Sequence, residues 1–317
     1  MKQFVKLWRG QKKPMDSEKI SFRHVSWLVF TNVLFLASPF CATALAGSDS
    51  IITKLNNTGV LYVGTRTHAA PFASKVNETQ FAGFTIDLIE QISFGISDDL
   101  GKPIITKLSP VTVKNRLKMV QDRKVDMVCG STTVTWSREK FVDFSIPFFI
   151  DGIRLLAQRK HALSGVFSLQ TSTIGIPDSK FIHGVITSHL PNAKIKKFKT
   201  VASAMIALEK GLIHAYSNDG SKLEHLRVNS RQANNLVLLP KSGVLEWEYF
   251  ACVLPEDQSK FKDLVNNQIL KMLRGLDNFS GTYAEIYFRW FGANGVIQIP
   301  LDASRQNKLT SFDIWLR

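Results

Sequence analysis

The feature of this sequence that most restricts its fold is a regular alternation of short apolar runs with helical patterns, which occurs twice. In the first series, the runs Val60–Gly64, Pro103–Leu108 and Val125–Gly130 predict strands. Gly83–Leu100 predicts a helix, and an apolar stripe starting at Val113 predicts a second one. Strands and helices in this order favour a parallel sheet with right-handed crossovers.

The second series begins with a long apolar segment, Ile146–Gln158, which predicts a strand that leaves one lobe for another. Its further elements are predicted strands at Thr173–Ile176, Ile195–Phe198, Ile213–Ser217 and Leu236–Leu239, and helices at Ser179–His189 and Val201–Lys210. Glu248–Leu254 is again extended and would carry the chain back. Helices are predicted at Ser259–Arg274 and Gly281–Trp290, whereas the tail 293–317 shows no clear period.

These elements predict an α/β fold with two lobes. Residues 47–152 and 253–317 would form lobe 1, and the inserted segment 153–252 would form lobe 2. Because two strands would cross between the lobes, we expect a ligand in the cleft, near the carboxyl ends of strands.

The N-terminus, residues 1–46, has the pattern of a secretory signal peptide. Seven basic residues precede or flank an apolar stretch, Trp27–Phe40, which is followed by Ala44-Leu45-Ala46. This order predicts export and cleavage after Ala46. The alternative is an uncleaved anchor helix, but the apolar run is shorter than the roughly 20 residues that a membrane span needs. The context of Cys41 does not resemble a lipid-attachment box.

Composition excludes several classes of protein. The formal charge is +14, yet the basic residues are dispersed, and the one Lys cluster at 194–199 is typical of a protected sheet edge. We therefore expect no nucleic-acid partner. The three Cys residues are too few for a disulfide scaffold and too scattered for structural zinc. Motifs for nucleotide binding, metal hydrolysis or a serine nucleophile are missing, so we predict no cofactor, no metal and no catalytic residue.

Polar side chains gather instead just after the predicted strands and in the segments that follow them. The candidate ligand-binding residues are Arg66, Phe72, Arg116, Ser131, Thr133, Arg138 and Asp219. Each has a simpler explanation that the sequence leaves open. Arg66 would then be a solvated loop residue and Asp219 a helix N-cap. Phe72, and Phe84 as a second candidate for the apolar wall of the site, would instead be core residues.

The run Asp126–Thr133, Arg138 five residues after Thr133, and Phe144-Ser-Ile-Pro-Phe resemble bacterial extracellular solute-binding proteins of family 3. The resemblance extends from about Leu55 to Phe291. It implies a type II periplasmic-binding-protein fold, with a parallel-rich sheet in each lobe and two hinge strands. It also implies a monomer in the periplasm that binds an amino acid and delivers it to the membrane permease of an ABC transporter.

The same resemblance implies roles for the candidates. Arg138 and Thr133 would bind the α-carboxylate, and Asp219 with Ser131 the ammonium group. Arg116 and Arg66 resemble the branch of the family that binds dicarboxylic amino acids, and they would bind a side-chain carboxylate as in glutamate or aspartate. Cys129 and Cys252 also resemble that branch and are expected to form a disulfide.

Some positions depart from that branch. Val113 replaces a small hydroxyl residue, Thr200-Val201 replaces a histidine, and Gly220 replaces a second aspartate. The ligand is therefore open to being a related dicarboxylate or another amino acid. Two other functions remain open, namely an enzyme similar to the cyclohexadienyl or arogenate dehydratases, and a ligand-sensing adaptor. A dehydratase needs a general acid in the cleft, and the sequence places no spare Glu or His there.

Overall fold

A computed structural model describes residues 50–312 of the chain. The predicted signal peptide, residues 1–46, lies outside the described residues, and so does Cys41. Among residues 50–312, no helix combines the length and apolar character that crossing a membrane requires.

The first sheet contains five strands in the order β5-β1-β6-β14-β7. Their bounds are Val60–Arg66 for β1, Ile105–Val111 for β5, Met127–Val128 for β6, Asp143–Phe144 for β7 and Val253–Leu254 for β14. Strand β1 pairs in parallel with β5 and β6, as predicted, whereas β14 pairs antiparallel with β6 and β7. A small antiparallel sheet is formed by β2 (His68–Ala69), β3 (Ala73–Lys75) and β4 (Phe81–Ala82).

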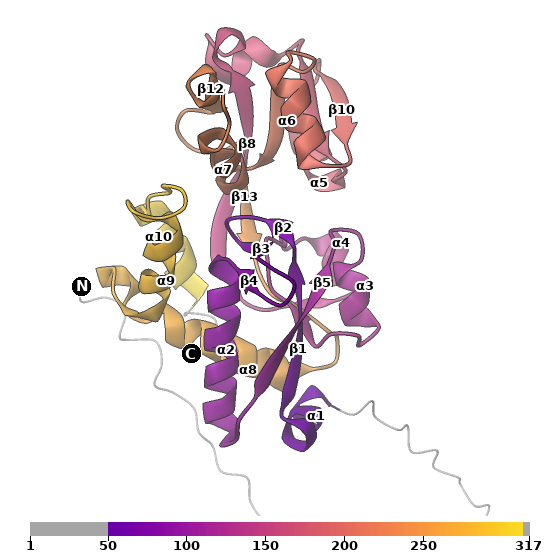
Figure 1. Ribbon diagram of the computed structural model, residues 1–317, viewed down its shortest axis with the longest axis vertical. Coiled ribbons are helices and arrows are strands. Elements are labelled where there is room, and N and C mark those ends of the chain that lie inside the picture. Colours follow the sequence, from indigo (N-terminus) through magenta and orange to yellow (C-terminus); the bar gives the residue numbers. More distant parts are fainter. Residues whose placement is uncertain (1–49, 313–317) are drawn as a thin grey trace, which may run out of the picture. The chain divides into compact units, whose positions relative to one another are not determined.

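The helices that accompany the first sheet come from both ends of the chain. They are α1 (Ile51–Thr58), α2 (Phe84–Leu100), α3 (Arg116–Gln121), α4 (Trp136–Glu139), α8 (Ser259–Leu273), α9 (Gly281–Phe291) and α10 (Ala303–Thr310), with a 3-10 turn at Leu276–Asn278. Helix α2 packs against α8 and α9 (Figure 1). The predicted bounds of α2, α8 and α9 are confirmed within one residue at each end.

The second sheet has the order β10-β9-β11-β8-β12, and β13 also pairs with β8. Its strands are β8 (Phe149–Gln158), β9 (Thr173–Pro177), β10 (Lys194–Phe198), β11 (Ala215–Asp219), β12 (Leu236–Leu239) and β13 (Glu246–Phe250). Its helices are α5 (Lys180–His189), α6 (Val201–Glu209) and α7 (Gly220–Val228), with 3-10 turns at Arg159–His161, Gly165–Leu169 and Ala233–Asn235. Strand β10 is an edge strand with exposed lysines, which confirms the prediction for the Lys cluster.

Strands β8 and β13 run side by side and connect the two sheets (Figure 1). Their antiparallel register runs from Glu246 opposite Ile153 to Phe250 opposite Phe149. After β13 the chain enters β14 of the first sheet. Each sheet is therefore mixed, because β14 in the first sheet and β8 in the second run antiparallel to their neighbours, although the βαβ part of each sheet is parallel. The division into lobes at residues 152 and 252 stays a prediction.

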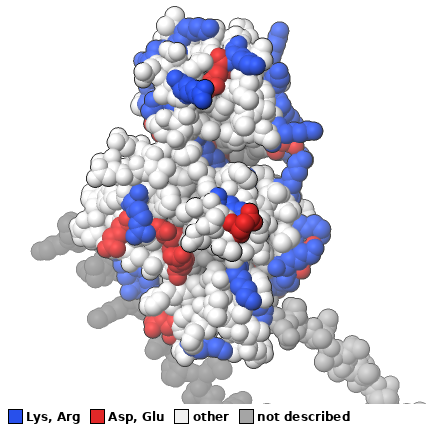
Figure 2. Space-filling view, viewed as in Figure 1, with Lys and Arg blue, Asp and Glu red and all other residues white. Residues whose placement is uncertain are grey.

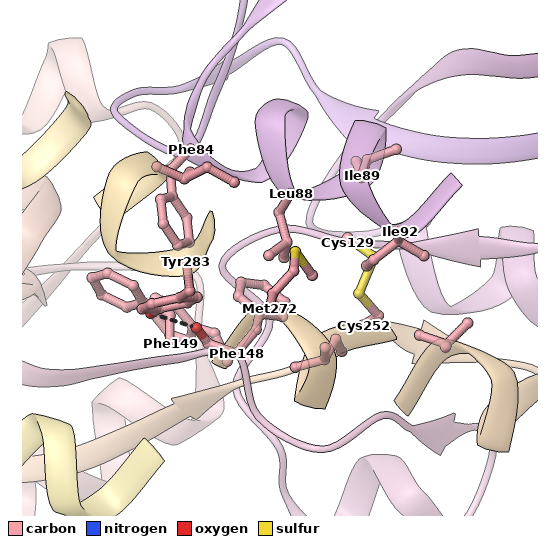
Figure 3. Close-up of a cluster of buried hydrophobic side chains, with 14 of the residues drawn as sticks. Phe84, Leu88, Ile89, Ile92, Cys129, Phe148, Phe149, Cys252, Met272 and Tyr283 are labelled. Carbon is pink, nitrogen blue, oxygen red and sulfur yellow. Dashed lines mark hydrogen bonds between the residues drawn. A yellow bond between two sulfur atoms is a disulfide. The ribbon is translucent and has the colours of Figure 1, made fainter. Parts of the chain in front are cut away.

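A disulfide joins Cys129, just after β6, to Cys252, between β13 and β14. Both cysteines are fully buried within the largest apolar cluster. Figure 3 shows this bond beside Ile92 of α2. The cross-link predicted from the resemblance is thus present in the structure.

An aromatic cluster fills the space between α2, β8 and α9. Phe84, Phe148, Phe149 and Tyr283 belong to it, and the Tyr283 hydroxyl donates a 2.8 Å hydrogen bond to the backbone oxygen of Phe148 (Figure 3). Phe72 is fully buried in this cluster, with its ring centroid 5.0 Å from that of Phe149. Placing Phe72 in the ligand-binding wall was therefore wrong, because tertiary packing directs its ring into the core.

Candidate functional site

A cavity of about 390 Å³ is lined by residues of both sheets and their loops. Six of the seven sequence-predicted residues line it, namely Arg66, Arg116, Ser131, Thr133, Arg138 and Asp219. The seventh, Phe72, lies in the core. The structure thus brings together, from segments up to 153 positions apart (219 − 66), the polar groups that the sequence placed after separate strands.

The three arginines reach this cavity from three different elements. Arg66 ends β1, Arg116 begins α3, and Arg138 lies in α4. Arg116 is only 5% exposed, and its Nη1 donates a 3.0 Å hydrogen bond to the backbone oxygen of Ser131. A cation at the start of a helix is opposed by the helix dipole, so helix formation does not explain Arg116 there.

Burial weakens the charged state of all three guanidinium groups. For Arg116, burial and the neighbouring charges of Arg138 and Arg66 lower the pKa to about 9. Burial also lowers the pKa of Arg66 and that of Arg138, although nearby carboxylates oppose the change. Three partly desolvated cations, of which Arg116 is repelled by the other two, favour the binding of an anion between them.

The loop after β6 is attached to strand β13. Val134 donates a backbone hydrogen bond of 2.9 Å to Tyr249, and the Thr133 hydroxyl donates one of 2.7 Å to Oε1 of Glu248. Nη1 of Arg138 donates to the backbone oxygen of Thr133. The loop, the arginine and the connecting strand therefore form one hydrogen-bonded unit along the wall of the cavity.

Glu248 is a site residue that the sequence analysis missed. It is 2% exposed and lines the cavity from β13. Burial, together with the nearby carboxylates of Asp219 and Asp151, raises the pKa of Glu248 well above its ordinary value. No local motif marks it, since it is one of two glutamates in an extended segment, and its partner Thr133 is 115 positions away.

Three buried polar atoms around this cavity find no hydrogen-bond partner among residues 50–312. They are Nε of Arg116, Oγ of Ser131 and Oε2 of Glu248. Buried polar atoms in folded proteins are nearly always hydrogen-bonded. Two unsatisfied donors and one carboxyl oxygen at the same cavity therefore indicate a binding site for a small polar ligand.

Asp219 ends β11 and occupies the N-cap position of α7, but its side chain makes no capping hydrogen bond. Its carboxylate instead forms an ion pair with Nζ of Lys222, at 2.5 Å. Lys222 lines the same cavity and was not predicted, although an Asp and a Lys three positions apart at a helix start are spaced to form a pair.

The remaining wall of the cavity contains positions at which this sequence departs from the branch of the family that binds dicarboxylic amino acids. Val113 and Thr200 both line it, and Thr200 uses its hydroxyl to accept the Ser203 amide at 3.1 Å, which caps α6. Phe181 and Phe198 supply aromatic surface in place of Phe72 and Phe84. Lys114 and Lys199 line the cavity at exposed positions.

In Figure 2, Lys and Arg side chains are scattered over the face shown, with Asp and Glu side chains among them. Between residues 50 and 312, no group of three His, Cys, Asp or Glu residues is arranged to hold a metal ion.

Comparisons with known proteins show what this architecture resembles. The glutamate/aspartate import solute-binding protein of Escherichia coli is 26% identical over 253 residues, which cover 78% of this chain and 82% of that protein. The glutamine-binding protein GlnH of Bacillus subtilis is 26% identical over 245 residues, covering 76% and 84%.

A solved structure shares the fold. It is that of the ancestral amino acid-binding protein AncCDT-1, a precursor of cyclohexadienyl dehydratase. Its TM-score is 0.61 at 24% identity, and the match covers 76% of this chain and 99% of that one. The fold is thus the two-lobed α/β fold of type II periplasmic amino-acid-binding proteins.

The model of the family described as bacterial extracellular solute-binding proteins, family 3, matches residues 61–293. This range contains both sheets except the first residue of β1, and it contains all the cavity residues discussed above. The chain therefore belongs to the bacterial extracellular solute-binding proteins of family 3.

Proposed function

We propose that this protein is the periplasmic solute-binding component of an ABC importer and that it binds an acidic amino acid, similar to glutamate or aspartate. The observation that carries this proposal is the convergence of Arg66, Arg116 and Arg138 on one cavity. A ligand with two carboxylates gives these arginines anionic partners. A neutral amino acid has one carboxylate, and it would leave buried guanidinium groups unpaired, which is costly.

The roles of the residues follow from their positions. Arg138, held against Thr133, binds the α-carboxylate as a bidentate pair. Arg116, whose Nε lacks a partner among residues 50–312, binds the side-chain carboxylate together with Arg66. Asp219 and Ser131 bind the ammonium group. The relatives include both glutamate/aspartate-binding and glutamine-binding proteins, so the arginines rather than the family support the acidic ligand.

Ligand binding would bring the two lobes together by bending at β8 and β13, which are the two connecting strands. The closed, loaded protein would then deliver its ligand to the membrane permease, as the family assignment supports. The exported, mature form would begin at Gly47.

A thermal-shift screen of the purified protein against all amino acids and small dicarboxylates tests this function. A ligand at 100 times its dissociation constant stabilises a protein by about 2.7 kcal/mol. We expect glutamate or aspartate to raise the melting temperature more than glutamine or asparagine, and Arg138→Ala to remove every shift. A protein stabilised only by neutral or basic amino acids would contradict the acidic assignment.

Glu248 favours a second candidate, an enzyme of the dehydratase type on the same fold. A general acid for such a reaction needs a carboxyl group that stays protonated, and the raised pKa of Glu248 provides one in the cavity. Incubation with prephenate and arogenate separates the two functions. A binding protein leaves both compounds unchanged. Turnover that Glu248→Gln abolishes would establish the enzyme instead.

A further inference from the structure

The Asp219–Lys222 ion pair lies inside the binding cavity rather than on the surface. The two side chains are 7% and 19% exposed, and both residues line the cavity. The carboxylate proposed to bind the ligand's ammonium group is therefore already paired with a cation of the protein.

The first turn of α7 explains why Asp219 is available for this pair. Asp151 on β8 accepts hydrogen bonds from the amide of Ser221, at 3.2 Å, and from its hydroxyl. Asp151 thus supplies the capping interaction that the N-cap residue itself would normally make. Gly220 leaves room for this arrangement, because a Cβ at that position would lie 3.3 Å from Oδ1 of Asp151.

The charged groups around Asp219 favour a competition between Lys222 and the ligand's ammonium group for its carboxylate. Arg66, Arg116 and Glu248 all interact electrostatically with Asp219, and Lys222 also acts on Glu248. When a ligand's ammonium group binds Asp219, Lys222 must leave it, and a lysine released into a cavity that already holds three arginines needs an anion.

We propose that Lys222 is a specificity-determining residue, an internal counter-ion that competes with the ligand's ammonium group for Asp219 and then pairs with a ligand carboxylate. This inference rests on the proposed function and extends it to the selection of the ligand. An acidic amino acid provides a second carboxylate for the displaced lysine, whereas a neutral amino acid does not. Lys222 would thus select against neutral amino acids.

The test uses ligands that differ only in the ammonium group, namely glutamate with glutarate and aspartate with succinate. Calorimetry gives the affinity ratio within each pair for the wild-type protein, for Lys222→Met and for Lys199→Met. Without Lys222, a ligand lacking the ammonium group leaves Asp219 unpaired, whereas an amino acid no longer has to displace a lysine. We expect Lys222→Met to raise the ratio of glutamate to glutarate affinity about tenfold or more.

Lys199→Met is the matched control, because Lys199 lines the same cavity at an exposed position and forms no ion pair with Asp219 within residues 50–312. It should leave the ratio unchanged. The same Lys222→Met protein should bind glutamine more tightly relative to glutamate. A ratio unchanged in Lys222→Met, with ligands still bound, would overturn the role of Lys222.

If the wild-type protein bound none of these ligands, the proposed function would fail instead. The ion pair is then tested in the free protein by a double-mutant cycle of Lys222→Met and Asp219→Asn, read as melting temperature. If the two side chains form an ion pair, the decreases in melting temperature of the two single variants should not add up to the decrease in the double variant. Additive losses would show that Lys222 does not act as the counter-ion of Asp219.

Discussion

The hydroxyl of Thr133 donates a 2.7 Å hydrogen bond to the carboxyl group of Glu248, across 115 positions of sequence. This contact joins the loop after β6 to β13, one of the two strands that connect the sheets. Its acceptor is a buried carboxyl group with a raised pKa, so the ionisation of Glu248 affects both the loop and the connecting strand.

Glu248→Gln is expected to change the dependence of stability on pH. The pKa of Glu248 is higher in the folded protein than the value of about 4.3 expected for the unfolded chain, so the folded protein keeps this proton at pH values where the unfolded chain has lost it. The free energy of unfolding of the wild type therefore falls as pH rises from about 4.3 toward the folded pKa. The Gln variant lacks this loss. Its melting temperature, measured without ligand, should exceed that of the wild type at about pH 7 and approach it at about pH 4.

The control for this prediction is Glu246→Gln, at an exposed position of the same strand. It should leave the pH profile unchanged. A Glu248→Gln protein less stable than the wild type by the same amount at every pH would show that folding does not shift the pKa of Glu248.

The Cys129–Cys252 disulfide should contribute strongly to stability. It closes a loop of 123 positions between two segments of the core, and removing a native disulfide typically costs about 2–5 kcal/mol. The variant with both residues changed to Ala should show this loss in denaturant titrations. Peptide mapping of the unreduced, denatured protein should find neither residue alkylated. Labelling of both thiols would rule out the bond in the exported protein.

Phe72→Leu should lower stability without changing ligand affinity, because its ring packs in the aromatic core. A loss of about 1–3 kcal/mol is typical of such a core substitution. Phe181→Leu is the matched variant, since this half-buried ring lines the cavity. It should change affinity with a smaller loss of stability. Weaker ligand binding by a folded Phe72→Leu protein would show that Phe72 belongs to the ligand-binding wall after all.

Most of the regular elements were predictable because each carries a local apolar period. Strand β12 was predicted at its observed bounds, Leu236–Leu239, and α2 differs from its prediction by one residue. Helix α10 was missed, since only Gln306 and Leu309 are buried in it and two positions define no stripe. The antiparallel pairing of β14 was missed because it joins segments more than 100 positions apart.

The site residues likewise fall into those that a local pattern or a family motif marks and those that only the folded structure reveals. The three arginines and Asp219 were found because they follow predicted strands or match a family motif. The sequence treated Phe72 and Phe84 alike as core or wall, and only packing places both rings in the core. Glu248 became a site residue through long-range burial, which no local pattern encodes. Lys222 was detectable from its spacing to Asp219, but its place in the cavity was not.

Calorimetric titration of Arg116→Met with glutamate and with glutamine tests the acidic-ligand assignment most directly. Methionine keeps the apolar stem of Arg116 and removes the charge, and Lys114→Met, at an exposed position of the same cavity, is the matched control. We predict that Arg116→Met weakens glutamate binding by about tenfold to a hundredfold while glutamine binding changes little or improves. If Arg116→Met and Arg66→Met both bound glutamate and aspartate as tightly as the wild type does, the arginines would not hold a side-chain carboxylate and the acidic assignment would be wrong.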